Sequence, residues 1–137
     1  MRESFSRGIV FIINANDAID SEELKALDAC ADNDKLFGLI CEKVQADIAI
    51  IVFSEKGFCD DKGKNISCVK IENLDKALSY AKGGSAMGHG KNGMETKLKI
   101  LCNLAKKNVQ SVLVSVGEKD FLLRAVDGEQ KFGTRFE

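Results

Sequence analysis

Three runs of consecutive apolar residues have the composition of buried β-strands. They span residues 8–14 (GIVFIIN), 47–53 (DIAIIVF) and 111–116 (SVLVSV). Each run is rich in β-branched residues and apolar at successive positions, which is typical of strands covered on both faces in a parallel sheet. Residues 66–71 and 133–136 form shorter runs. We expect them to form short strands, the first of them at a sheet edge.

Helical periodicity fills the intervals between these runs. One apolar stripe, with Asp32 placed as its N-cap, consists of Leu36, Phe37, Ile40, Cys41 and Val44. A second stripe, which ends near Asn108, consists of Met94, Leu98, Leu101 and Ala105. We also expect helices over residues 73–82 and 119–126, the latter closed by Asp127-Gly128.

The order strand, helix, strand predicts βαβ units, whose loops at the carboxyl ends of the strands usually form one ligand crevice. The sequences NAND and FSEKG follow the first two strands and would face that crevice. A chain of 137 residues with 45% apolar residues is of single-domain size. We therefore expect one α/β domain over residues 1–137, with a mainly parallel sheet.

Charge and cysteine content restrict the classes of partner. The 20 basic and 21 acidic residues leave a net charge of −1, which favours neither nucleic acid nor an anionic membrane as partner. The five cysteines contain no CxxC, and His89 is the only histidine, so no zinc site is predicted. We expect reduced core thiols. Because residues 1–8 are polar and no apolar run reaches membrane-spanning length, we expect a cytoplasmic protein.

The glycine-rich segment at residues 83–93 is the first candidate for chemistry. Glycines allow close backbone approach, and the N–H groups at the start of a following helix attract anions. Lys97 is expected in or near the first turn of that helix, where it could hold a phosphate-like anion. The sequence GHGKNGMETK lacks the GK[ST] ending of a P-loop. A flexible surface loop remains the alternative.

Polar residues at the ends of the predicted elements are a second candidate. Asp17 closes the first strand, and Asp32, Asn33 and Asp34 open the next helix. Such groups can orient a ligand ammonium or a metal–phosphate assembly, although helix capping and turn formation explain the same residue types. His89 has no identifiable nucleophile partner and is assigned no role.

Three motifs occur in a specific order. IINANDAIDSEELK followed by DND resembles the glutamate-contacting segment of the amino acid kinase family, and GHGKNGMETKLK resembles the family's Gly-Thr-Gly-Gly-Met-x-Thr-Lys nucleotide segment. GTRF at residues 133–136 resembles its closing motif. The chain is thus similar to this family along nearly its whole length, and most closely to the C-terminal half of glutamate 5-kinases. The fold implied is a three-layer α-β-α half-domain.

The resemblance also implies a function. It implies ATP-dependent phosphorylation of the γ-carboxylate of L-glutamate in proline biosynthesis, with Mg²⁺ bridging the ATP phosphates. Asp17 and Asn33 would then contact glutamate, and Asp34 would have the catalytic role of organising the lysines. The nucleotide-binding residues implied are Lys97, which would contact the ATP phosphates, together with Gly90, Gly93 and Met94.

Three features depart from the family pattern. The family's N-terminal half has no counterpart here, Phe53-Ser54 replaces a Thr-Asp pair, and Lys91-Asn92 replaces a Thr-Gly pair. One interpretation is the nucleotide-binding half of an enzyme whose N-terminal half is a separate chain, without catalysis by this chain alone. The other is a non-catalytic relative that binds a nucleotide or a partner, or a remnant. In both, exposed edges predict self-association.

Overall fold

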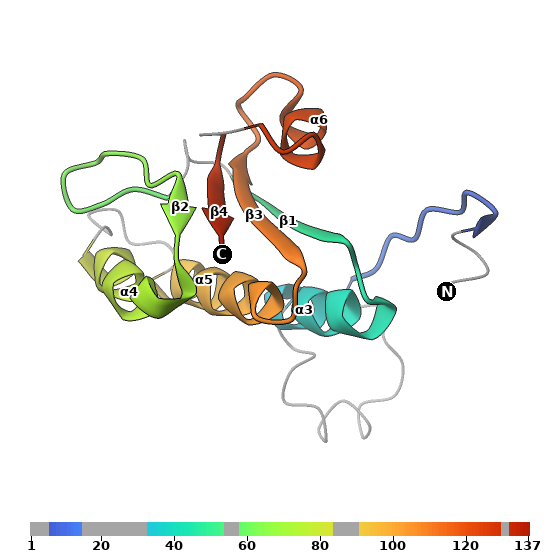
Figure 1. The fold of residues 1–137 in the computed structure, drawn as a ribbon, viewed down its shortest axis with the longest axis horizontal. Coiled ribbons are helices and arrows are strands. Elements are labelled where there is room, and N and C mark those ends of the chain that lie inside the picture. The colour runs from blue at the N-terminus through green and yellow to red at the C-terminus, as the bar shows by residue number, and fades with distance from the viewer. Residues whose placement is uncertain (1–5, 15–32, 54–57, 84–90, 130–131) are drawn as a thin grey trace. The chain divides into compact units, whose positions relative to one another are not determined.

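The structure is a computed structural model that describes residues 6–14, 33–53, 58–83, 91–129 and 132–137. The chain divides into two compact units, Met1–Ala46 and Asp47–Glu137. The elements of each are labelled in Figure 1, and each unit is described by itself. The expectation of one domain over residues 1–137 stays a prediction.

In the first unit, the helix predicted from the first apolar stripe is confirmed as α3, Asn33–Val44. Its end is defined by two backbone hydrogen bonds, from Gln45 N to Glu42 O (3.2 Å) and from Ala46 N to Cys41 O (2.9 Å). Gln45 has a positive φ of 54°. This is the Schellman arrangement, in which a left-handed residue satisfies the last helical carbonyls. The predicted N-cap, Asp32, lies outside the described residues.

The strand expected over residues 8–14 is not formed. Residues 9–14 belong to no strand, and the side chains of Val10 and Ile12 are 85% and 95% exposed. An apolar, β-branched run has the composition of a strand, but a strand also needs a neighbour that completes its hydrogen bonds. The prediction was wrong because composition does not supply that neighbour.

The second unit contains a four-stranded sheet. Its strands are β1 (Ile48–Phe53), β2 (Cys68–Val69), β3 (Gln110–Ser115) and β4 (Thr134–Phe136). The strand order is β1-β3-β4-β2, so the short β2 lies at an edge as expected. The β1–β3 and β2–β4 pairs are parallel and the β3–β4 pair is antiparallel. The prediction of a mainly parallel sheet is confirmed.

Helices cover both faces of this sheet. Val112 and Val114 on one face of β3 pack with Ala125 of α6 (Phe121–Val126). The opposite face is covered by α5 (Lys91–Ala105), whose Leu98 and Leu101 are fully buried. In Figure 1, α4 (Leu74–Gly83) lies beside α5 on one side of the strands, and α6 lies on the other. The three-layer α/β architecture is therefore confirmed, with the 3₁₀ turn Ile71–Asn73 leading into α4.

Candidate functional site

The helix that follows the glycine-rich segment begins earlier than its apolar stripe suggested. α5 starts at Lys91, so Gly93 is helical and Lys97 is the seventh residue of the helix. Lys97 therefore lies in the second turn, next to the first turn near which it was expected. A helical glycine costs about 1 kcal/mol relative to alanine. The burial of Leu98 and Leu101 can offset this cost and anchor the helix.

The side chain of Lys97 nevertheless returns to the first turn of α5. Its Nζ lies 3.9 Å from the position that a Cβ would take on Gly93. This geometry follows from the helix, because side chains lean toward the N-terminus and residues i and i+4 share a face. The ammonium group therefore lies beside a turn whose backbone N–H groups lack intrahelical acceptors.

The charges around this turn favour an anion. The first turn of α5 contains no acidic residue. The nearest acidic side chain along the helix, Glu95, is engaged by Lys99, whose Nζ lies 2.6 Å from the Glu95 carboxylate. Helix N–H groups, the helix dipole and the Lys97 ammonium all act in the same direction. Met94 is partly buried in this turn, and Gly90 lies outside the described residues.

The start of α3 borders a hollow in the first unit. A cavity of about 480 Å³ is lined by Phe11, Ile13, Asn14, Asn33, Leu36, Phe37 and Ile40. Its polar members, Asn14 and Asn33, come from the NAND and DND sequences. Asp34 lies in the first turn of α3, where the helix dipole favours a carboxylate. Asp17 lies outside the described residues.

The candidate residues thus form two groups in different units. Asn33 and Asp34 belong to the first unit, and Gly93, Met94 and Lys97 belong to the second. Their roles in binding and catalysis stay predictions.

Comparison with known proteins identifies the family to which this chain belongs. Residues 1–115 match the amino acid kinase family. The chain belongs to this family. It is 31% identical to the glutamate 5-kinase of Shewanella amazonensis and 33% identical to that of Shewanella halifaxensis, each over 135 residues. Identity to the glutamate 5-kinase of an Azoarcus species is 32% over 126 residues.

These alignments cover most of this chain but a minor part of each relative. They include 96%, 96% and 89% of the chain and 34%, 35% and 33% of the respective relatives. This amino acid kinase family member therefore spans about a third of the length of the curated relatives it matches. The resemblance read from the three motifs is confirmed at the level of the family.

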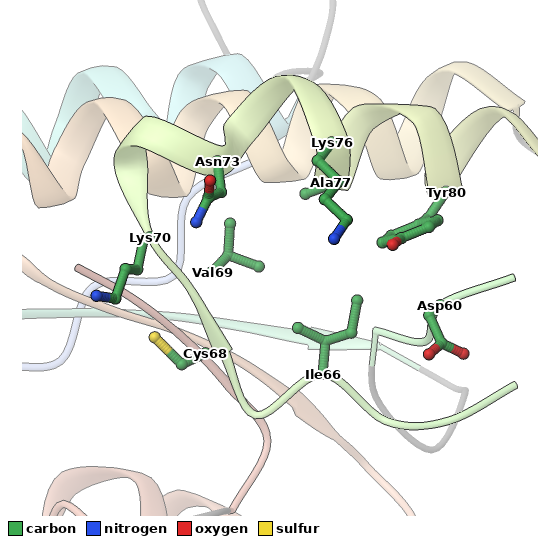
Figure 2. Close-up of a pocket in the computed structure, with 9 residues that line it drawn as sticks. All are labelled: Asp60, Ile66, Cys68, Val69, Lys70, Asn73, Lys76, Ala77 and Tyr80. Atoms are coloured by element: carbon green, nitrogen blue, oxygen red, sulfur yellow. The ribbon is translucent and has the colours of Figure 1, made fainter. Parts of the chain in front are cut away.

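The sequence did not predict a second cavity in this family member, in the unit Asp47–Glu137. It measures about 430 Å³ and lies between α4 and the segment that leads into β2 (Figure 2). Its lining consists of Asp60, Ile66, Cys68, Val69, Lys70, Asn73, Lys76, Ala77 and Tyr80. In the sequence, the spacing of residues 73, 76, 77 and 80 predicted that they share one face of a helix. This spacing cannot show whether the segment opposite that face leaves a cavity.

The cysteines only partly follow the expectation of core thiols. Cys41 and Cys102 are buried, whereas Cys68 is exposed, and none of the four described cysteines forms a disulfide. The Cys68 thiol donates a hydrogen bond of 3.0 Å to Glu137 Oε1. Local desolvation, followed by the hydrogen bond to Glu137 and the charge of Glu137, raises the pKa of Cys68 to about 11. Cys68 is therefore a poor nucleophile near neutral pH.

Within the described ranges, no group of three or more His, Cys, Asp or Glu side chains could hold a metal ion. In the same part of the chain, no helix combines the length and the apolar character that a membrane span requires.

Proposed function

We propose that this chain is the nucleotide-binding part of a glutamate 5-kinase-type phosphotransferase. The observation that carries the proposal is the position of Lys97 Nζ, 3.9 Å from the Cβ position of Gly93 at the start of α5. Family membership and similarity to glutamate 5-kinases over 96% of the chain support the same assignment. The substrates proposed are ATP and L-glutamate, and the pathway is proline biosynthesis.

Phosphoryl transfer needs positioning and charge neutralisation more than covalent chemistry by the protein. The Lys97 ammonium would neutralise phosphate oxygens of ATP, and the first N–H groups of α5 would donate hydrogen bonds to them. Mg²⁺ bound with the ATP phosphates would supply further charge neutralisation there.

The residues proposed to bind glutamate, Asp17 and Asn33, belong to the first unit. Asn33 would donate an amide hydrogen bond to a substrate carboxylate, and Asp17 would accept one from the substrate ammonium. Asp34 would orient the lysines that contact the transferred phosphoryl group. The remaining phosphate-binding and substrate groups would come from a separate N-terminal half, which is the proposed partner.

The phosphate site can be tested by isothermal titration with ATP and Mg²⁺. We expect Lys97→Ala to weaken binding about tenfold, because a charge-assisted contact to phosphate contributes roughly 1.5–3 kcal/mol. Lys99→Ala is the matched control. It removes the same charge from the same helix, but its ammonium does not lie within 4 Å of the Gly93 Cβ position. Equal affinities of Lys97→Ala and the unaltered chain would refute the phosphate assignment.

Catalysis can be tested by mixing the chain with the N-terminal portion of a glutamate 5-kinase. We expect glutamate-dependent release of ADP from the mixture and none above background from either chain alone. Asn33→Ala should raise the KM for glutamate more than that for ATP, because it removes a substrate contact and leaves the α5 site intact. A mixture no more active than its separate components would exclude the enzyme-component hypothesis.

A non-catalytic member of the family is the second candidate. The observation that favours it is the exposed apolar segment at residues 9–13, which provides a surface for a partner chain. A nucleotide-binding relative would bind ATP in the titration and stay inactive in every mixture. A remnant would do neither.

A further inference from the structure

The cavity beside α4 has the dimensions of a small-molecule site. Its volume of about 430 Å³ falls within the range of roughly 300–1,000 Å³ that is usual for ligand pockets. One wall is a single face of α4, which carries Lys76, Ala77 and Tyr80 (Figure 2). The other wall is the segment from Asp60 to Val69. An isolated antiparallel β-bridge between Cys59 and Asn65 holds the start of this segment. Both walls belong to the unit Asp47–Glu137.

The floor of this cavity is apolar and well packed. Val69 and Ala77 are only 3% and 4% exposed, and Ile66 is partly buried. Figure 2 shows the Tyr80 ring beside these side chains, on the same face of α4 as Ala77. A flat or branched apolar group could therefore lie between the aliphatic floor and an aromatic ring, which favours stacked or edge-on contacts.

Two lysines and one aspartate are the charged residues that line this cavity. Figure 2 shows the Lys76 ammonium directed into the cavity next to Tyr80, whereas the Lys70 ammonium points away from it. Among the described residues, neither Lys76 Nζ nor the Tyr80 hydroxyl has a hydrogen-bond or ion-pair partner. Asp60 is engaged by its own turn, since its Oδ1 accepts hydrogen bonds from Lys62 N (3.0 Å) and Lys64 N (2.9 Å).

We propose that this cavity binds a small organic acid with an apolar or aromatic body. The carboxylate of the ligand would pair with the Lys76 ammonium and accept a hydrogen bond from the Tyr80 hydroxyl. Its body would cover Val69 and Ala77 against the Tyr80 ring. The side chains of this site do not include the residues assigned to ATP or glutamate, so the site would be separate from the proposed substrate sites.

Titration of the full chain with 3-phenylpropionate, followed by amide ¹H–¹⁵N shifts, tests the proposal. We expect saturable shifts at Val69, Ala77 and Tyr80 and at least fivefold weaker binding of the neutral 3-phenylpropionamide. Lys76→Met keeps the apolar stem and removes the charge, so it should weaken 3-phenylpropionate binding at least fivefold. Lys62→Met is the matched control. It removes a lysine from the neighbouring turn that does not line the cavity, and it should leave binding unchanged.

Three results would show that this cavity does not bind an organic acid as proposed. These are the absence of saturation at millimolar probe, equal binding of acid and amide, or equal effects of Lys76→Met and Lys62→Met. Competition with ATP and Mg²⁺ separates this site from the nucleotide site. Binding of 3-phenylpropionate that is unchanged by saturating nucleotide and by Lys97→Ala supports a separate site. Displacement of the probe by nucleotide would instead make the cavity part of the ATP site and refute its independence.

Discussion

At the scale of single residues, Gly133 shows why the C-terminal GTRF sequence begins with glycine. Gly133 has a φ of +64°, and a Cβ at this position would lie 2.5 Å from Leu113 O and 3.0 Å from Val114 Cγ1. The clash is with the backbone of β3, so a rotamer change cannot relieve it. The following Thr134 is fully buried and donates a hydrogen bond of 2.6 Å to Ile66 O. Gly133 thus lets β4 enter the sheet next to β3.

We expect Gly133→Ala to lower the free energy of unfolding by about 3 kcal/mol. A left-handed alanine costs roughly 1–2 kcal/mol, and overpacking adds roughly 1–3 kcal/mol. Gly63→Ala is the control, because Gly63 has a φ of +76° but no atom within 4 Å of its Cβ position. Urea denaturation gives the free energy of unfolding of both variants. The loss in Gly63→Ala measures the backbone cost alone, and the additional loss in Gly133→Ala measures the clash. Equal losses in the two variants would contradict the packing explanation.

Cys68 gives a prediction about reactivity and pH. Its pKa is raised from 9.0 to about 11, so the thiol should be alkylated slowly at pH 8 although it is exposed. The folded state retains the proton longer than the unfolded state. The stability from this group is therefore fully present below about pH 9 and is lost as pH rises toward 11.

Iodoacetamide labelling with peptide mass analysis measures this effect. Glu137→Gln should speed labelling of Cys68, because the carboxylate of Glu137 is one cause of the raised pKa. Glu72→Gln, which removes a carboxylate that is not among those causes, should leave the labelling rate unchanged. Labelling of Cys68 that is as fast in the unaltered chain as in the unfolded chain would show that the thiol is not protected.

At the scale of elements, three helices end in the same way. α3, α5 and α6 are each followed, within three residues, by a residue of positive φ, namely Gln45, Asn108 and Gly128. Each of these residues and its successor donates backbone hydrogen bonds to the last helical turn. The sequence predicted the ends at Asn108 and Gly128, because asparagine and glycine tolerate the left-handed region. Gln45 carries no such signal, so that end could not be read from residue type.

We expect Gln45→Gly to stabilise α3 by up to about 1 kcal/mol. Glycine removes the left-handed penalty of roughly 1–2 kcal/mol, and part of the gain is lost because glycine adds entropy to the unfolded chain. Glu42→Gly, in the last turns of the same helix, should instead destabilise it by about 1 kcal/mol. Amide hydrogen exchange across residues 33–44 reports the change. Faster exchange in Gln45→Gly would contradict it.

Periodicity predicted most elements because it reflects which faces are buried. The stripe of Leu98 and Leu101 is fully buried in α5, as its spacing indicated. The start of α5 was placed too late, since Lys91, Asn92 and Gly93 precede the stripe and gave no helical signal. Periodicity also could not reveal the cavity beside α4. That space depends on how residues 60–69 pack against a helix that follows them in sequence.

At the scale of the whole molecule, the α/β class and the family could be read from the chain, but the assembly of a site could not. The motifs placed Asn33 and Lys97 in one functional scheme, yet these residues belong to different units. Contacts between units depend on complementary surfaces of distant segments, which neither spacing nor composition describes. That Asn33 and Lys97 serve one active site therefore rests on the family resemblance. The experiments with Lys97→Ala and Asn33→Ala test this assignment.

The exposed apolar surface predicts self-association. Val10 and Ile12 are 85% and 95% exposed in a β-prone segment, and β1 and β2 form the two edges of the sheet. An edge strand and an exposed apolar segment both favour addition of a further strand from another chain. We expect a dimer or larger species by light scattering at micromolar concentration.

A double variant, Val10→Lys with Ile12→Lys, should shift the protein toward monomer. Charged side chains on such a segment oppose strand addition, both by repulsion between copies and by the cost of desolvating an ammonium group. Leu123→Lys with Val126→Lys is the matched control, because these α6 side chains are also exposed (65% and 58%) but lie on a helix that cannot add to a sheet. An unaltered chain that is already monomeric would contradict self-association. An equal shift in both double variants would show that general apolar exposure, and not the segment at residues 9–13, causes it.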